Sequence, residues 1–217
     1  ILLLIAMPAV AQEPCSFTIA RLHYGGGGDW YANPSSLPNL IVAVKEQTSI
    51  PVCDTVAVVK IMDDALFMHP FVHMTGHGNV KFTHEERLRL RRFLGGGGFL
   101  WADDNYGMDE SFRREMNVLF PENPLVEVPR DHPIYHRVHS LPGVPKIHEH
   151  DGKPAQGLGI FFDDRLVVFY TCSADIGDGM EDVSVHNDPL RLHRLALNMG
   201  VNIIAWFMYP LEGAHTR

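Results

Sequence analysis

The sequence predicts one three-layer α/β domain, in which a mostly parallel sheet carries helices on both faces. Three observations support this fold class. Runs rich in β-branched and aromatic residues alternate with amphipathic helical segments, as in proteins with helix-covered parallel sheets. The chain has 217 residues, of which 46% are hydrophobic, and this is enough for one sizeable core. No internal repeat, low-complexity tract or linker divides the sequence.

The first half of the chain alternates strands and helices. A β-rich run at residues 17–24 predicts the first strand. Asn33 followed by Pro34 predicts the N-cap and first turn of a helix that continues to about residue 47 with apolar residues on one face. Two further β-rich runs, 56–61 and 71–75, predict the second and third strands.

The next segment carries a strong helix-start signal. Thr83 with Glu86 is a capping box, and it predicts a helix that ends near Leu94, before a run of glycines. Residues 99–102 predict a short buried strand. Asp109 is expected to cap the helix that follows.

The last part of the chain is less regular. Residues 125–153 are rich in proline and histidine and are expected to form irregular structure. Strands at 159–162 and 166–170 are joined by a turn at residues 163–164. Residues 192–207 predict a long amphipathic helix, whose polar residues and glycine near the middle indicate a packing helix and not a membrane span.

Residues 1–11 are typical of the end of a secretory signal peptide. They are apolar and uncharged, and Ala9 and Ala11 form the small-x-small pattern of a cleavage site before Gln12. A buried N-terminal strand is the alternative. We therefore expect residues 12–217 to form the mature domain, outside the cytoplasm, either periplasmic or secreted.

The three cysteines are Cys15, Cys53 and Cys172, an odd number for an oxidising compartment. One disulfide with one free thiol, or three free thiols, are both compatible with the sequence.

The charge balance excludes two classes of main partner. The 18 Lys and Arg residues are outnumbered by 26 Asp and Glu residues, which gives a net charge of −8. Nucleic acids and anionic membranes are bound by positive surfaces, so neither is expected here.

Polar residues follow several predicted strands at their carboxyl ends, where ligands bind in open α/β sheets. We expect them to form a site for a small polar ligand or a metal ion. Helix capping and turn formation are the alternative for each residue, although His77, between two glycines, fits that alternative least well. The candidate ligand-binding residues are Asp29, Trp30, His77, Asp103, Asp104, Asn105, Asp175 and His186, with Ser173, Asp178 and Glu181 on the same polar rim.

A second candidate is the sequence His148-Glu149-His150-Asp151. In an extended segment His148 and His150 point to the same side, as two ligands of one divalent metal ion would. Chance is the alternative, because the chain has 13 histidines. No other cofactor is indicated.

Several common catalytic signatures are absent. Gly25–Gly28 is not followed by the residues of a phosphate-binding loop, and Gly95–Gly98 lies between a helix and a strand, the wrong order for a dinucleotide fingerprint. There is no Gly-x-Ser-x-Gly motif. Cys172 with His186 is a possible nucleophile pair, but a buried structural cysteine is the simpler interpretation.

Five longer motifs carry a family resemblance: Tyr24–Tyr31, Met74–Gly78, Phe99–Asn105, Ser111–Glu115 and Ile147–Gly152. They resemble one bacterial family, domain-of-unknown-function family 4159, over essentially all of residues 17–208. The resemblance implies a class I glutamine-amidotransferase-like, flavodoxin-type fold, found in secreted single domains or on membrane proteins near von Willebrand-type and MoxR-type partners. It implies no activity.

The chain is more distantly similar to trehalose-utilisation-type domains, through residues 132–134 and 168–170 among others. Amidotransferases carry a cysteine nucleophile on the turn after a central strand. Residues 103–107 occupy that turn here and contain neither cysteine nor serine, so glutaminase activity is not expected.

Three hypotheses of function follow. The first is a non-enzymatic module, lacking the nucleophile, that binds a small polar ligand or an envelope protein. The second is a metal-dependent hydrolase of carbohydrate or cell-wall material, in which His77, Asp103, Asp104, His148 and His150 are ligands or acid–base groups. The third is a structural partner in an envelope assembly.

Overall fold

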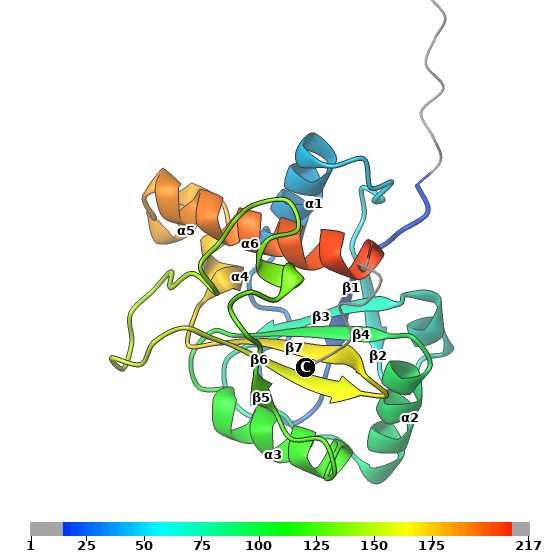
Figure 1. Cartoon of the computed structure of the whole chain (residues 1–217). Helices are drawn as coiled ribbons and strands as arrows, with labels where there is room; N and C mark the ends of the chain where they lie inside the picture. The colour runs from blue at the N-terminus through cyan, green and yellow to red at the C-terminus, as the bar shows by residue number, and fades with distance from the viewer. Residues whose placement is uncertain (1–14, 210–217) are drawn as a thin grey trace, which may run out of the picture.

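The computed structural model describes residues 15–209. Seven strands form one sheet in the order β2-β1-β3-β4-β7-β6-β5 (Figure 1). Neighbours from β2 to β7 run parallel, whereas β6 pairs antiparallel with both β7 and β5. The predicted α/β class and mostly parallel sheet are confirmed. The strands are β1 (Ala20–His23), β2 (Ala57–Lys60), β3 (Phe71–Gly76), β4 (Phe99–Asp104), β5 (Val126–Glu127), β6 (Gln156–Phe162) and β7 (Arg165–Cys172).

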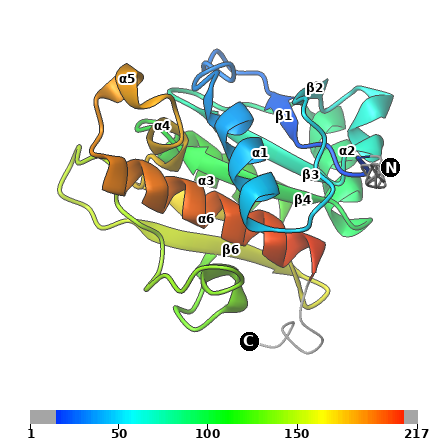
Figure 2. The same cartoon turned by 90° about the horizontal axis from the view of Figure 1, so that it is seen from above.

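Helices cover both faces of this sheet. Helices α1 (Ser36–Gln47), α4 (Ile176–Gly179) and α6 (Leu190–Met208) contact one another on one face, and Figure 2 shows α1 and α6 lying across it. Helices α2 (His84–Gly95) and α3 (Asp109–Leu119) lie on the other face. The short elements are η1 (Asp64–Met68), η2 (Pro133–Tyr135) and α5 (Val183–His186).

Strand β4 supplies side chains to both cores. Phe99 and Trp101 pack into the core under α1 and α6, whereas Leu100 and Ala102 pack into the core under α2 and α3. This alternation follows from the two-residue period of a strand. The same alternation places Asp103 and Asp104, the next two residues of β4, in opposite layers, and both are buried.

The start of α1 differs from the sequence prediction. The helix begins at Ser36, and Asn33 is not its N-cap, because Asn33 has a φ of +57° and its side chain donates to Asp178. The backbone N–H groups at the start of α1 instead donate to a side chain from a distant part of the sequence. Glu181 accepts hydrogen bonds from the backbone N–H groups of Ser35 and Ser36.

Two further predictions are wrong by a few residues. Strand β4 extends to Asp104, so Asp103 and Asp104 lie inside the strand and not in a turn after it. Asp109 is the first residue of α3 and not its cap. The capping box of Thr83 and Glu86 is confirmed, with both reciprocal hydrogen bonds present.

The structure shows which of the three cysteines form a disulfide and which one is a free thiol. Cys15 and Cys53 are bonded, and Cys172 is a buried free cysteine. The expected signal peptide, residues 1–11, and the cleavage position before Gln12 lie outside the described residues. Among residues 15–209, no helix combines the length and the apolar character that crossing a membrane requires.

Candidate functional site

Histidines and carboxylates meet where the chain leaves β7. The segment after β7 places Asp175 at the start of α4, Asp178 within α4 and His186 at the end of α5. The segment 147–150 lies beside it, because the Ile147 N–H donates to the Ala174 carbonyl at 2.9 Å. Ile147 is buried in the core, and His148 Nδ1 lies 3.4 Å from Asp178 Oδ2 in α4. We call His148, His150, Asp175, Asp178, His186 and Asp188 the His–Asp cluster.

His150 and His148 both contact one oxygen of Asp175. His150 Nε2 is hydrogen-bonded to Asp175 Oδ2, and His148 Nδ1 lies 3.3 Å from the same oxygen. One donor atom from each of the three residues lies within 4.8 Å of the other two. Ligand atoms around a tetrahedral zinc ion are separated by about 3.3 Å, so small side-chain movements bring these three into coordination distance.

Asp175 is the buried member of this group. Its side chain is 1% exposed, and its Oδ1 has no hydrogen-bond partner within the described part of the chain. Burial raises the pKa of Asp175, although the hydrogen bond and charge of His150 oppose that change. A buried carboxylate oxygen without a donor is costly, and a cation would satisfy it.

The hydrogen bonds of His148 decide which of its ring nitrogens faces the carboxylates. Its Nε2 lies 3.0 and 3.1 Å from the two oxygens of Asp188, so this nitrogen carries the proton that Asp188 accepts. Nδ1 then faces Asp175 and Asp178, at 3.3 and 3.4 Å. In a neutral ring Nδ1 has only a lone pair, which requires a proton or a metal ion between it and the carboxylates.

The charge around His148 favours a cation at that position. Burial lowers the pKa of His148, but the hydrogen bond to Asp188 and the charges of Asp188, Asp178 and Asp175 outweigh burial and raise it. A carboxylate that accepts the second N–H of a histidine is also the usual outer partner of a metal-bound imidazole. Asp188 therefore occupies the position of a residue that orients a metal ligand.

A chain of amides connects this cluster to the centre of the sheet. Thr75 donates to Asn105 at 3.0 Å, Asn105 donates to Asn33 at 2.7 Å, and Asn33 donates to Asp178 at 2.8 Å. Gly177 must remain a glycine, because a Cβ there would lie 2.5 Å from the Asn33 amide nitrogen. These contacts fix the position of Asp178 relative to strands β3 and β4.

Asp103 holds the start of α4 against the sheet. It accepts hydrogen bonds from Thr171 and from the backbone N–H groups of Gly177, at 2.6 Å, and Ile176, at 3.3 Å. Burial raises the pKa of Asp103 to about 8, despite the opposing hydrogen bonds. Asp103 thus positions the segment that carries Asp175 and Asp178.

Asp104 and Cys172 belong to the opposite face. Asp104 accepts from the Met108 N–H at 2.9 Å, at the start of α3. Cys172 Sγ lies 3.3 Å from Asp109 Oδ1, and burial together with that carboxylate raises the pKa of Cys172 to about 12. A thiol in this environment is a poor nucleophile, and Cys172 contacts Asp109 while His186 lies beside Asp178.

His77, Asp29 and Trp30 form a separate group at the ends of β1 and β3. Asp29 accepts from the His77 backbone N–H, and its second oxygen lies 3.0 Å from His77 Nδ1. Trp30 stacks on His23, with ring centroids 4.0 Å apart. None of these residues forms a hydrogen bond or ion pair with the His–Asp cluster among the described contacts.

Strained backbone is concentrated around the cluster. Asn33, Tyr106, Ser173 and Asp175 all have positive φ, which is uncommon for residues other than glycine. Tyr106, at +74°, stacks on the His150 ring with centroids 4.6 Å apart. Such strain is typical of functional sites, where the surrounding structure maintains it.

The sequence analysis named most of these residues in two groups. It gave His148 and His150 as metal ligands, and Asp175 and His186 as ligand-binding residues; the structure places all four in one cluster. Asp188, Asn33 and Tyr106 were missed. The only sequence signal for Asp188 was its place two residues after His186 on a polar turn.

The comparisons with known proteins identify the family. The family model described as "Domain of unknown function (DUF4159)" matches residues 18–208, and the chain belongs to this family. No curated protein matches the chain.

Proposed function

We propose that the protein binds one divalent transition-metal ion, of the zinc type, through His148, His150 and Asp175, and uses it to hydrolyse a substrate. The observation that carries this proposal is the convergence of two imidazoles and one buried carboxylate within 4.8 Å. Imidazole and carboxylate are common zinc ligands. The second oxygen of the same carboxylate, Asp175 Oδ1, is buried and accepts no hydrogen bond within residues 15–209, which also favours a cation beside this side chain.

His148, His150 and Asp175 would hold the ion, and three protein ligands are typical of catalytic and not of structural zinc sites. The ion would supply a bound water that is acidic enough to act as a nucleophile at neutral pH. Asp178, whose Oδ2 lies 3.4 Å from His148 Nδ1, would accept the proton of that water. The proposed substrate class remains extracytoplasmic carbohydrate or cell-wall material.

Metal content tests the binding step. The full chain, untagged and purified without chelator, is incubated with zinc, dialysed and analysed for metal. We expect about one equivalent of zinc in the wild type and less than a tenth of that in His148→Ala and His150→Ala. His77→Ala is the matched control and retains zinc. A zinc-free wild type, or zinc retained by both cluster variants, overturns the proposal.

Ligand binding without catalysis is the second candidate function. It is supported by the high pKa of Cys172 and by residues 103–107, which offer no cysteine or serine nucleophile. A panel of nitrophenyl esters, phosphates and glycosides separates the two. Hydrolysis by the zinc-loaded wild type that is lost in His150→Ala supports the hydrolase, whereas stoichiometric zinc without hydrolysis favours the binding module.

The proposal also includes a flavodoxin-like fold type and a location outside the cytoplasm. The order β2-β1-β3-β4-β7 has the pattern of a flavodoxin-like sheet, which supports the class I glutamine-amidotransferase-like assignment. The Cys15–Cys53 disulfide supports an extracytoplasmic location, periplasmic or secreted, because such bonds persist in oxidising compartments.

A further inference from the structure

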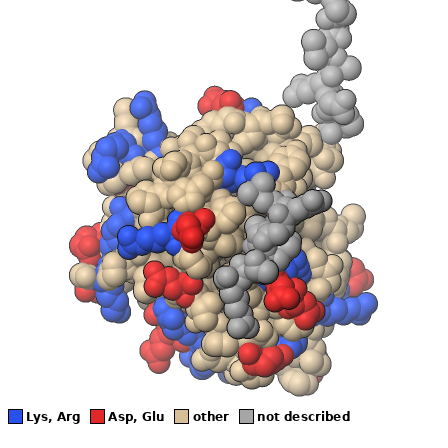
Figure 3. All heavy atoms as spheres, in the orientation of Figure 1, with Lys and Arg blue, Asp and Glu red and all other residues tan. Residues whose placement is uncertain are grey.

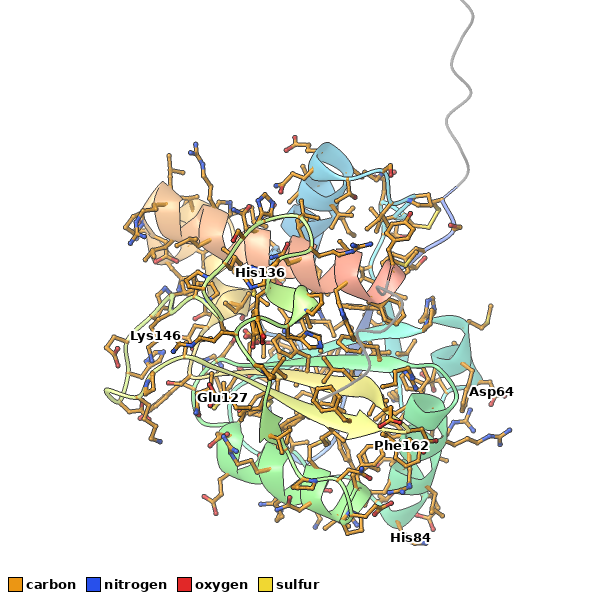
Figure 4. The ribbon with its side chains drawn as sticks, in the orientation of Figure 1. Asp64, His84, Glu127, His136, Lys146 and Phe162 are labelled. Atoms are coloured by element: carbon orange, nitrogen blue, oxygen red, sulfur yellow. A yellow bond between two sulfur atoms is a disulfide. The ribbon has the colours of Figure 1, made fainter. Side chains whose placement is uncertain are left out.

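A groove lies between the start of α6 and the β5–β6 edge of the sheet. Its volume is about 400 Å³, within the range of small-molecule sites. We call it the α6 groove. Glu127 and Lys146, whose positions are labelled in Figure 4, are both among its lining residues.

The walls of the α6 groove are positively charged, although the whole protein is acidic. Arg130, Lys146 and Arg191 line it, against one acidic residue, Glu127. In Figure 3, Lys and Arg atoms are visible over the start of α6. Within residues 15–209, the guanidinium groups of Arg130 and Arg191 make no hydrogen bond or ion pair. Two unpaired guanidinium groups at one groove favour an oxyanion, which they can bind through paired hydrogen bonds.

Lys146 is held in a fixed position at the same groove. Its ammonium group donates to the Lys153 carbonyl at 2.8 Å and to Ser173 Oγ at 2.9 Å. Both partners are neutral oxygen atoms, and Glu149 lies further away, at 3.7 Å. The positive charge of Lys146 is therefore only partly balanced by its neighbours.

The remaining lining is largely apolar. Val128, Tyr135, Leu141, Leu192 and Leu195 contribute to it. A ligand that fills the groove thus gains from burying apolar surface as well as from its charge. Neither a bare inorganic anion nor a neutral hydrocarbon matches both parts of the lining.

Two residues that line the α6 groove are close in sequence to residues of the His–Asp cluster. Lys146 is two residues before His148, and Arg191 is three residues after Asp188. Alternate residues of an extended segment share a side, so Lys146 lies on the same side of its segment as His148. The α6 groove itself is lined by none of the residues of the His–Asp cluster, so its ligand and the proposed metal are tested separately.

We propose that the α6 groove binds the body of a small organic anion, an apolar group that carries a carboxylate or a phosphate, with Arg130 and Arg191 holding the oxyanion. The binding of such an anion is a separate property of the groove, and it does not depend on the proposed hydrolysis of carbohydrate or cell-wall material. Anion binding itself does not require the metal.

The test uses calorimetric titration of the metal-free full chain with three probes of similar shape: phenylbutyrate, phenylbutyl phosphate and the neutral phenylbutyramide. We expect at least one anion to bind about tenfold or more tightly than the amide, because charge-assisted hydrogen bonds are about twice as strong as neutral ones. The tighter of the two anions identifies the oxyanion. Equal affinity for amide and anions, or no binding of any probe, overturns the proposal.

Variants assign the effect to named residues. Arg130→Gln and Arg191→Gln are expected to weaken anion binding about tenfold each, without changing amide binding. Arg194→Gln is the matched control, because Arg194 is an exposed arginine on the same helix that lines a different cavity. Equal losses in Arg194→Gln and Arg191→Gln overturn the assignment to the groove.

The two proposals fail in different ways. His148→Ala is expected to lose zinc but to keep its affinity for the anion. If the wild type binds the anion but no zinc, the proposed metal site is wrong and the groove assignment stands. If it binds zinc but no probe, the groove assignment is wrong and the metal site stands.

Discussion

The two faces of the sheet at its carboxyl edge use the same kinds of residue for different purposes. Asp103 and Asp104 are adjacent and buried, yet Asp103 faces α4 and the His–Asp cluster, whereas Asp104 faces the start of α3. On the α3 face, the Asp104 carboxylate accepts a hydrogen bond from the backbone N–H of Met108, which is only four residues away at the start of α3. On the α4 face hydrogen bonds join residues more than 70 positions apart. The α3 face also has long-range contacts, from Tyr170 and Cys172 to Asp109, so the candidate site is distinguished by the meeting of several histidines and carboxylates.

The largest expected difference between the faces is in stability. Asp103→Ala leaves the backbone N–H groups of Ile176 and Gly177 without an acceptor, at about 1–3 kcal/mol each, while Thr171 keeps its hydrogen bond to the Ala102 carbonyl, so we expect a loss of about 2–6 kcal/mol. Asp104→Ala removes one hydrogen bond at a helix start and should cost about 1 kcal/mol. Urea unfolding of both variants measures this, and equal losses would contradict the distinction.

The next effect concerns metal affinity. Asp188→Ala removes the acceptor that orients His148, and we expect zinc affinity to fall about 10- to 100-fold. Asp109→Ala, on the α3 face, is the control and should leave zinc affinity unchanged. Competition with a chromogenic chelator gives both values. An unchanged zinc affinity in Asp188→Ala would show that Asp188 does not orient a metal ligand.

A third prediction concerns how the free energy of unfolding depends on pH through His73, which lies on the same face of the sheet as Asp103. Complete burial, with a smaller contribution from Arg21, lowers the pKa of His73 to about 3. The unfolded chain binds the proton at a pKa of about 6.5, so His73 makes the folded state less stable as the pH falls from 6.5 toward 3. Between pH 7.5 and pH 5 this amounts to about 2 kcal/mol.

His73→Phe tests that value, because phenylalanine has a similar shape and does not titrate. We expect the wild type to lose about 2 kcal/mol relative to His73→Phe over that pH interval. Urea unfolding at the two pH values gives the difference. Parallel pH profiles for the two proteins would show that folding does not lower the pKa of His73.

The smallest effect is expected far from the site. Thr83→Ala removes the capping box of α2, which should cost about 1 kcal/mol in stability. Zinc and anion binding should remain at wild-type levels, because α2 lies on the opposite face from the His–Asp cluster. A change in either binding constant would indicate that the two faces are coupled.

The sequence predicted the fold where local signals decide it. The β-rich runs predicted six of the seven strands of the described sheet to within a few residues, and Thr83 with Glu86 predicted the start of α2. Strand β5 was not predicted, because its two residues lie in the stretch 125–153 that was expected to be irregular. Asp103 and Asp104 were expected in a turn, because aspartate is rare in strands. Their placement inside β4 depends on donors from α3 and α4, which a local pattern does not contain.

The candidate site could be predicted only in part, for the same reason. The spacing of His148 and His150 indicated a shared direction, which is a local property. Their meeting with Asp175 depends on the contact between segment 147–150 and the turn after β7, which follows from the tertiary structure. Asn33 was interpreted as a helix cap because Asn before Pro is a common start signal, whereas its side chain binds Asp178.

The Cys15–Cys53 disulfide also determines how the fold responds to mechanical force. The bond closes a loop that contains β1, Asn33 and α1. Tension applied to the chain before Cys15 passes through the sulfur atoms to Cys53 and bypasses residues 16–52. The amide of Asn33 therefore keeps its contact with Asp178 under a pull that would otherwise extend β1 and α1 first.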